Sequence, residues 1–262
     1  QPLNKHASFK AGGDLAILTE DGIISVSEAL RKDRAALQAV AITYPIEDAW
    51  RSAIANRTIT YPITATLWQS KTLLLVGTPA VVDGGNPVSF AANARTGAWA
   101  RITGWDVRCS AVFNDNLYFG ASDGVVYQAD SGGSDGGVEY TATYVPKFAD
   151  TDSRQSVMAA QVQYRATTAA DVALYAHSDY QVDPMDAPLP STAQSGDVWG
   201  TGVWGEFVWG ASEPVYTFDE WQFVRANGYS FAPGFTITSN QNSLLEFELI
   251  ATRIRVEGGY AL

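Results

Sequence analysis

The stretch of sequence that says most about the fold is Leu15-Ala-Ile-Leu-Thr-Glu-Asp-Gly-Ile-Ile-Ser25, which aligns without gaps with Leu117-Tyr-Phe-Gly-Ala-Ser-Asp-Gly-Val-Val-Tyr127. In both stretches an Asp-Gly pair, Asp21-Gly22 or Asp123-Gly124, separates an apolar run from a β-branched run. Such a pair favours a type I′ turn, because both central residues of that turn need a positive φ. The sequence therefore predicts two similar β-hairpins.

Two further hairpins are predicted between these stretches. One covers Thr66 to Val76 and turns near Gln69 to Lys71, and the other covers Val88 to Ile102 and begins its return strand at Trp99 after a turn at residues 95–97. Short hairpins that recur with glycine and aromatic residues are typical of β-propeller blades.

Residues 1–137 are therefore predicted to form propeller-like hairpin blades. At about 40–45 residues a blade, this segment holds roughly three, fewer than the usual minimum of four. Either residues absent from this sequence complete the ring, or the hairpins belong to a different all-β arrangement. The alternative is a set of unrelated hairpins in a mixed β fold.

A short helical insertion at about residues 26–56 interrupts the strands. Ser25-Val-Ser-Glu28 has the spacing of a capping box, which predicts a helix that begins after Ser25 and continues to Ile42. Pro45 ends that helix and opens a second one. The apolar residues expected on a common face are Leu30, Leu37 and Ala41 in the first helix and Ile46, Trp50 and Ile54 in the second.

Residues 138–262 are predicted to form a second domain, an antiparallel β-sandwich-like region. A glycine-rich turn at residues 130–137 precedes it. Its expected strands are the alternating runs 139–145, 157–165, 171–177, 221–226, 235–238 and 244–256. The proline-bearing segment 182–196 is a long loop, and its length indicates that it contacts something else.

The Trp-Gly ribbon, Trp199-Gly-Thr-Gly-Val-Trp204-Gly-Glu-Phe-Val-Trp209-Gly210, is the strongest interaction signal in the second domain. Neither a strand nor a helix brings Trp residues spaced by five onto one face, so we expect each indole to fill a separate pocket. Large aromatics dominate interface energies. The residues predicted to lie at a subunit interface are Trp199, Trp204, Trp209, Trp221, Pro184 and Pro188.

Two other interpretations of the same region stay open. The Trp residues could stack on sugars in a carbohydrate-binding protein. Four carboxylates near the ribbon could also contain a glycoside-hydrolysing pair, although solvated loop charges are the simpler interpretation. These residues are Glu206, Glu213, Asp219 and Glu220.

Composition argues against most catalytic and nucleic-acid-gripping functions. Seventeen basic and 28 acidic residues give a formal net charge of −11, and phosphate grips need excess Lys and Arg. Two histidines and Cys109, expected to be a buried filler, supply little for a zinc site or a catalytic triad. His177 stands beside Ser178 and Asp179, but neighbouring strand residues point to opposite faces.

We therefore predict no catalytic residue, no cofactor and no bound metal. The acidic residues Asp123, Asp130 and Asp135 favour plain turns over a calcium loop, because the alternating ligand pattern of such a loop is missing. Membrane insertion is not expected either, since no run approaches the roughly 20 apolar residues that a spanning helix needs.

Five stretches, taken in order, resemble one group of proteins. They are Leu15 to Leu30, Asn93-Ala-Arg-Thr-Gly-Ala-Trp99, Leu117 to Tyr127, the Trp-Gly ribbon and Glu257-Gly-Gly-Tyr-Ala-Leu262. Together they resemble the C-terminal part of tailed-bacteriophage virion proteins, similar to short-tail nozzle, tail-hub or packaged-DNA-stabilisation proteins.

The resemblance implies a structural virion protein in the phage tail. Such a subunit contains a propeller and joins identical copies in a ring of about six, below the portal and adaptor and beside tail-fibre proteins. DNA is retained by this conduit and leaves the capsid through it, and an acidic wall would repel the phosphates. A carbohydrate-binding or glycan-cleaving tail receptor and a bacterial β-propeller binding module are the alternatives.

Overall fold

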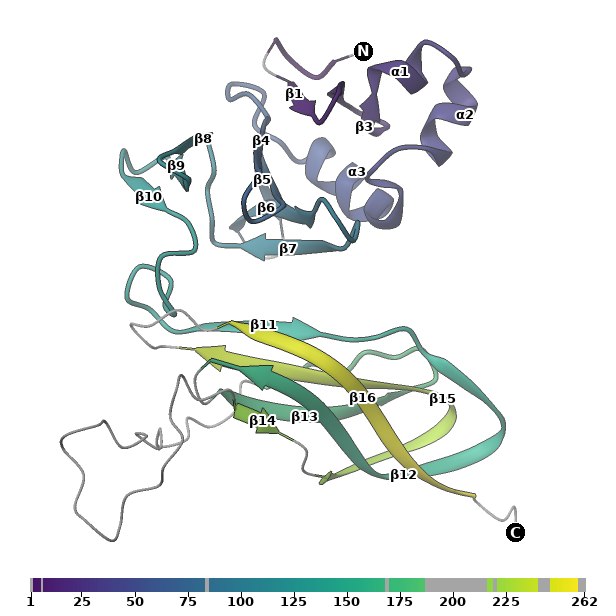
Figure 1. Cartoon of the computed structure of the whole chain (residues 1–262). Coiled ribbons are helices and arrows are strands. Elements are labelled where there is room, and N and C mark those ends of the chain that lie inside the picture. Colours follow the sequence, from purple (N-terminus) through teal and green to yellow (C-terminus); the bar gives the residue numbers. More distant parts are fainter. Residues whose placement is uncertain are drawn as a thin grey trace, which may run out of the picture. The chain divides into compact units, whose positions relative to one another are not determined.

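The structure is a computed structural model that describes residues 2–5, 7–82, 85–167, 170–186, 216–218, 221–239 and 246–258 (Figure 1). These residues are mainly β, in several antiparallel sheets of which none closes into a barrel. The chain divides into two compact units, Gln1–Asp130 and Ser131–Leu262. The division falls at the start of the glycine-rich turn, whereas the sequence prediction placed it after Gly137.

The first unit contains three antiparallel sheets that follow one another along the chain. Each is a meander in which consecutive strands pair, as in a propeller blade. The strands are β1 (Ser8–Ala11), β2 (Asp14–Thr19) and β3 (Gly22–Ser25) in the first sheet, β4 (Thr64–Trp68), β5 (Leu73–Val82), β6 (Asn86–Asn93) and β7 (Trp99–Thr103) in the second, and β8 (Cys109–Phe113), β9 (Asn116–Gly120) and β10 (Val126–Gln128) in the third.

All four predicted hairpins are present, but the type I′ turns at the Asp-Gly pairs are not. Strands β2 and β3 pair up to Gly22, so Glu20 and Asp21 form the turn and Gly22, with φ 132°, closes it. In the second pair Gly124 has φ 81°, whereas Asp123 does not have a positive φ. In each stretch the glycine therefore takes the positive φ alone.

In the third sheet, a turn with positive φ at both central residues lies one strand earlier. Asn114 and Asp115, with φ 47° and 61°, join β8 to β9 while Phe113 pairs with Asn116. Asn and Asp tolerate this conformation better than other residues with side chains. The hairpins over Thr66–Val76 and Val88–Ile102 are confirmed, including Trp99 as the first residue of β7.

The three sheets pack face to face. Leu74 and Val76 of β5 belong to an apolar core shared with the first sheet and a helix, whereas Leu75, from the opposite side of the strand, packs with Leu117 and Phe119 of the third sheet. The second sheet is thus covered on both faces. This successive stacking is the arrangement that the blade pattern predicts.

The helical insertion is broken into short pieces: α1 (Val26–Ala29), α2 (Arg34–Ala39), the 3₁₀ turn η1 (Tyr44–Ile46) and α3 (Glu47–Ala55). The Ser25 cap is confirmed, because its hydroxyl accepts a hydrogen bond from the Glu28 amide. A continuous helix to Ile42 is wrong. The chain leaves α1 at Leu30, which is 83% exposed, and the Asp33 carbonyl accepts the first hydrogen bonds of a new helix.

Helix α3 confirms the second predicted helix. It follows Pro45 and buries Trp50 and Ile54 in the core of the first unit. The indole N–H of Trp50 donates to the Thr19 carbonyl at 3.1 Å, so this polar group is satisfied where it is buried.

The second unit is an antiparallel arrangement of two layers around one core. It contains β11 (Tyr140–Tyr144), β12 (Ala149–Ala166), β13 (Asp171–Ser178), β14 (Tyr216–Phe218), β15 (Trp221–Ser239) and β16 (Phe247–Gly258). In the first layer β12 lies between β16 and the first half of β15; in the second layer the other half of β15 lies between β11 and β13.

The two layers meet through aromatic contacts. The ring of Phe235 in the second layer lies 5.9 Å from that of Phe247 in the first, and Phe247 also stacks on Tyr164 at 4.5 Å. The predicted sandwich-like region is confirmed. The separate strands expected at 221–226 and 235–238 are instead one 19-residue strand, β15.

Candidate interaction surfaces

The predicted interface residues fall partly outside the described residues. Trp199, Trp204, Trp209 and Pro188 lie there, as do the carboxylates Glu206, Glu213, Asp219 and Glu220. Trp221 and Pro184 are described, and both are exposed. They lie on two different surfaces of the second unit, built from β12, β15 and β16 in one case and from the segment after β13 in the other.

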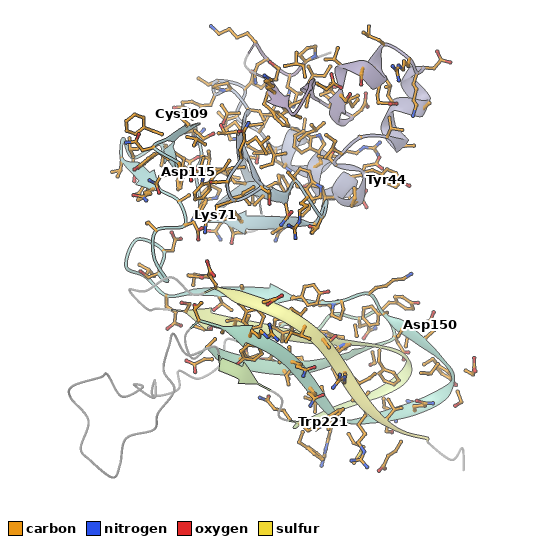
Figure 2. The ribbon with its side chains drawn as sticks, viewed as in Figure 1. Tyr44, Lys71, Cys109, Asp115, Asp150 and Trp221 are labelled. Atoms are coloured by element: carbon orange, nitrogen blue, oxygen red, sulfur yellow. The ribbon has the colours of Figure 1, made fainter. Side chains whose placement is uncertain are left out.

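The surface that contains Trp221 is the outward side of the first layer (Figure 2). Along β15, Val224 points into the core while Trp221, Phe223 and Arg225 point outward, as strand alternation requires. Trp221 is 50% and Phe223 66% exposed. The Arg225 guanidinium lies 5.4 Å from the Phe223 ring centroid, within the range of a cation–π contact.

Two more arginines reach this surface from β16. Gln161 of the central strand β12 pairs with Trp221 on one side and Arg253 on the other, and Ala159 pairs with Phe223 and Arg255 in the same way. The Arg253 guanidinium donates to the Gln161 side-chain oxygen at 3.2 Å. We call the set Trp221, Phe223, Arg225, Arg253 and Arg255 the arginine face.

Sequence reasoning found Trp221 but missed the arginines. A local signal existed, because Arg225 lies two residues after Phe223, and Arg253 and Arg255 alternate within an expected strand. What could not be read from the sequence is the register that places β16 beside β12, and with it both arginines opposite the two aromatics across β12.

The surface that contains Pro184 is acidic. After β13 the chain turns at Asp179 and Tyr180, both with positive φ, and continues through Asp183 and Asp186, which are exposed. The Tyr180 hydroxyl donates to the Asp150 carboxylate at 2.8 Å, and this hydrogen bond raises the pKa of Tyr180. We call residues 179–186 the acidic loop.

Three hydrogen bonds fix the acidic loop on the outward side of the second layer. The Tyr175 hydroxyl of β13 and the Thr236 hydroxyl of β15 donate to the Asp186 carbonyl at 2.6 and 3.1 Å. The Asp183 amide donates to Nδ1 of His177 at 3.3 Å. The other side of this sheet, formed by β13 and β15, packs in the core. The acidic loop and the arginine face therefore lie on opposite outward sides of the second unit.

His177, Ser178 and Asp179 are not arranged as a nucleophile relay. His177 is buried, and burial lowers the pKa of its imidazole, which favours the neutral form that accepts from the Asp183 amide. The Asp179 carboxylate instead accepts from the backbone amides of Tyr229 and Ser230 at 2.7 and 3.3 Å. These contacts stabilise the turn at Asp179 and Tyr180, where the acidic loop begins.

A third surface is the outward face of β8–β10 in the first unit. Leu117 and Phe119 of β9 point toward the second sheet, so Cys109, Ala111 and Phe113 of β8, which alternate with the positions paired to them, point away from it. The expectation that Cys109 is buried is wrong, since the register places it on this exposed side (Figure 2). Phe113 is 65% exposed, and Val126 of β10, on the same side, is 69% exposed.

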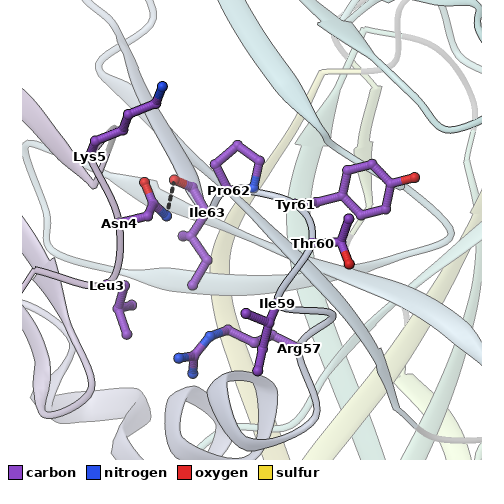
Figure 3. Close-up of a pocket in the computed structure, with 9 residues that line it drawn as sticks. All are labelled: Leu3, Asn4, Lys5, Arg57, Ile59, Thr60, Tyr61, Pro62 and Ile63. Atoms are coloured by element: carbon purple, nitrogen blue, oxygen red, sulfur yellow. Dashed lines mark hydrogen bonds between the residues drawn. The ribbon is translucent and has the colours of Figure 1, made fainter.

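One hollow of the first unit lies between the N-terminal segment and the loop after α3 (Figure 3). Asn4, Arg57 and Tyr61, which line it, contact other parts of the same unit. The Asn4 amide donates to the Ile63 carbonyl at 3.3 Å, and Arg57 donates to the Ile54 carbonyl at 2.8 Å, near the end of α3. Tyr61 lies under the Arg108 guanidinium at 4.2 Å.

The acidic turn residues have structural partners. Asp130 forms an ion pair with Lys71 at 3.5 Å, and the Asp123 carboxylate accepts from the Val125 amide and the Tyr127 hydroxyl at 2.9 and 2.6 Å. Within the described ranges no group of three or more His, Cys, Asp or Glu side chains is placed to hold a metal. Among the same residues no helix has the length and apolar character to cross a bilayer.

Comparison with protein-family models and with curated proteins finds no match to this chain.

Proposed function

We propose that the chain is a structural component of a tailed-bacteriophage virion, part of a ring-shaped nozzle in which DNA is retained and from which it is ejected. The observation that carries the proposal is the stack of three blade-like sheets with an uncovered apolar face at one end. At the other end of the stack, the outward side of the first sheet is partly covered. Ile24 on that side is buried, and Leu37 lines a hollow beside it.

The uncovered face of β8–β10 suits contact with a neighbouring copy. Its outward residues Cys109, Ala111, Phe113 and Val126 carry no charge, on a chain of net charge −11. A contiguous patch of exposed apolar side chains often marks a contact with another protein, whereas single exposed apolar residues are common on any surface. The resemblance of residues 15–30, 93–99 and 117–127 to phage nozzle proteins supports the same assembly, a ring of about six copies with adaptor and tail-fibre neighbours.

The proposed mechanism requires no catalytic residue and no cofactor. Residues 131–262 carry six basic and 16 acidic side chains, and residues 1–130 carry 11 and 12. A conduit that passes DNA should repel phosphates, because each Lys or Arg contact to the backbone would retain the polymer. The acidic excess of the second unit favours passage without binding.

The mass of the purified chain tests the proposal. Multi-angle light scattering and negative-stain images should show an annular particle of about six copies. Phe113→Glu places a charge on the outward face of β8 and should reduce the particle mass. Leu30→Glu, at an apolar residue outside that face that is even more exposed than Phe113, should leave the mass unchanged. A chain that stays monomeric at every concentration contradicts the proposal.

A carbohydrate-binding tail protein is the second candidate, because exposed Trp221 lies beside exposed Phe223 on one sheet face. Such platforms can stack on sugar rings. Binding on a glycan array, together with a saccharide-dependent change in Trp fluorescence that Trp221→Ala removes, would favour this candidate over the nozzle.

A further inference from the structure

We infer that the arginine face of one copy binds the acidic loop of a second copy, so that copies associate head to tail through their second units. The inference rests on the proposed assembly function and names one of its contacts. The occupant of the arginine face is thus another copy of this chain.

Charge complementarity is the first argument. Of the six basic residues in 131–262, Arg225, Arg253 and Arg255 gather on one side of the first layer. On the opposite outward side, Asp183 and Asp186 are exposed in a loop whose backbone is hydrogen-bonded to side chains of β13 and β15. Arginine pairs well with carboxylates because its planar fork can donate two parallel hydrogen bonds.

The apolar parts of the two surfaces also match. Trp221 and Phe223 lie on the same face as the arginines, across β12 from Arg253 and Arg255, and the acidic loop offers Val182 and Pro184 beside its carboxylates. Interface energy is concentrated in Trp, Tyr and Arg side chains that lose their water on contact. Pro184 limits the loop's backbone freedom, which reduces the entropy lost on binding.

The location of the two surfaces determines the kind of assembly. They are different surfaces on opposite sides of one unit, so each copy uses its arginine face toward one neighbour and its acidic loop toward the other. Such a heterologous contact gives a closed ring when the rotation between copies closes, and an open filament when it does not. A two-fold dimer would need the same patch on both partners, and the arginine face would then meet its own charge.

A long polyanion is a poorer occupant of the same face. Glu248 pairs with Arg165 on one side of the arginines and Glu257 pairs with Ser156 on the other, so carboxylates follow on β16 in both directions. Nucleic acid would meet these carboxylates within a few phosphates of Arg253, whereas a short acidic loop need not extend beyond the arginines. The patch is thus suited to a compact acidic partner.

A charge-swap experiment on the 262-residue chain tests the inference. Reversing the arginine face with Arg253→Glu and Arg255→Glu should weaken association on the order of 100-fold, as should Asp183→Arg with Asp186→Arg. The chain carrying all four substitutions restores opposite charges and should assemble like the native chain. Sedimentation at several protein concentrations measures the association constant, and circular dichroism confirms that each variant is folded.

Matched controls separate this contact from general charge effects. Lys10→Glu with Arg95→Glu changes the net charge as much as the arginine-face pair, at exposed sites of the first unit, and should leave association unchanged. Benzoylphenylalanine in place of Phe223 should crosslink to residues 179–186 of another copy under light.

The outcomes separate the two proposals. If the native chain forms annular particles that neither reversal alters, or if the crosslinks lie elsewhere, the head-to-tail contact is wrong and the nozzle proposal stands. If the native chain never associates, both fail. If the arginine reversal instead abolishes binding of a saccharide or of single-stranded DNA, the face has a different occupant and the inference is overturned.

Discussion

Asp14 connects the start of β2 to the start of α1. Its carboxylate accepts hydrogen bonds from the Ser25 hydroxyl, from the Ser27 hydroxyl at 2.7 Å and from the Leu15 amide at 2.8 Å. These bonds, that of Ser25 above all, lower the pKa of Asp14 to about 2. Ser25 also caps α1, so one carboxylate orients the residue at which the strand gives way to the helix.

We expect Asp14→Asn to lower the Tm of the first unit at neutral pH. The folded pKa, about 2, lies below the ordinary value of 3.8, so the ionised carboxylate stabilises the fold above about pH 4. That contribution is lost as the pH falls toward 2. The difference in Tm between native and variant chains should therefore shrink over this range in thermal melts.

A control places the effect at Asp14. Asp152→Asn removes an exposed carboxylate from the second unit and should leave the first unit's melting unchanged. A Tm difference for Asp14→Asn that is the same at pH 2 and pH 7 would show that the carboxylate has no special role.

At the scale of elements, the second sheet was the most predictable part. β4 to β7 are local hairpins, and their turns lie close to their strands in sequence, so turn residues and apolar runs were enough to locate them. The helix over 26–42 was predicted with the right cap and the wrong length. Asp33 starts a second helix there, and the capping pattern at Ser25 carries no information about it.

Strand β15 could not be predicted as one element, because its middle carries Gly228, Pro233 and Gly234, residues that ordinarily interrupt a strand. The structure supplies a reason for each glycine. A Cβ at Gly228 would lie 2.6 Å from the Asp179 carboxylate, and one at Gly234 would lie 2.7 Å from His177 Nε2. Partners that distant in sequence leave no local pattern.

The arginine face was hidden for the same reason. Trp221 could be proposed as an interface residue from its type alone. Arg253 and Arg255 can be assigned to this face only from the pairing of β16 with β12. That pairing joins residues about 90 positions apart in the sequence. Strand periodicity predicts which side a residue takes, but not which strand lies beside it.

Gly77 of β5 tests the contact between the second and third sheets. A Cβ at this position would lie 2.6 Å from the Val107 carbonyl oxygen and 2.7 Å from its side chain. Because the nearest atom is backbone, the Val107 segment would have to move. We expect Gly77→Ala to destabilise the first unit by about 1–3 kcal/mol, measured by chemical unfolding.

Gly13 offers a matched control for this prediction. A Cβ there meets no atom within 4 Å, and Gly13 has no positive φ, so Gly13→Ala should change the unfolding free energy by less than about 0.5 kcal/mol. Equal effects of the two substitutions would mean that the close approach of Val107 is not a constraint on packing.

At the scale of the whole molecule, the negative charge is unevenly distributed. The first unit is nearly balanced, with 11 basic and 12 acidic residues, and the second has six against 16. In the proposed assembly the arginine face is covered by a neighbour's acidic loop. The contact thus removes three of the six basic residues of the second unit from any DNA that passes, and leaves an acidic excess on its remaining surface.

This charge distribution predicts how the assembled chain treats duplex DNA. We expect the native chain to bind it more weakly than about 100 μM at physiological salt, because too few free cations remain to displace counterions. Glu139→Lys with Glu246→Lys adds positive charge at exposed positions outside the arginine face and the acidic loop, and should produce binding that weakens steeply as salt rises.

The corresponding Gln variants provide the comparison, because they remove the two negative charges without adding cations. Fluorescence anisotropy over a salt series should show the weakest DNA binding for the native chain, stronger binding for the Gln variant and the strongest binding for the Lys variant. If these positions line the conduit, particles that carry the Lys variant should also release DNA more slowly than native particles. Tight, strongly salt-dependent binding by the native chain would contradict the conduit mechanism, since a wall that holds phosphates cannot let the polymer pass freely.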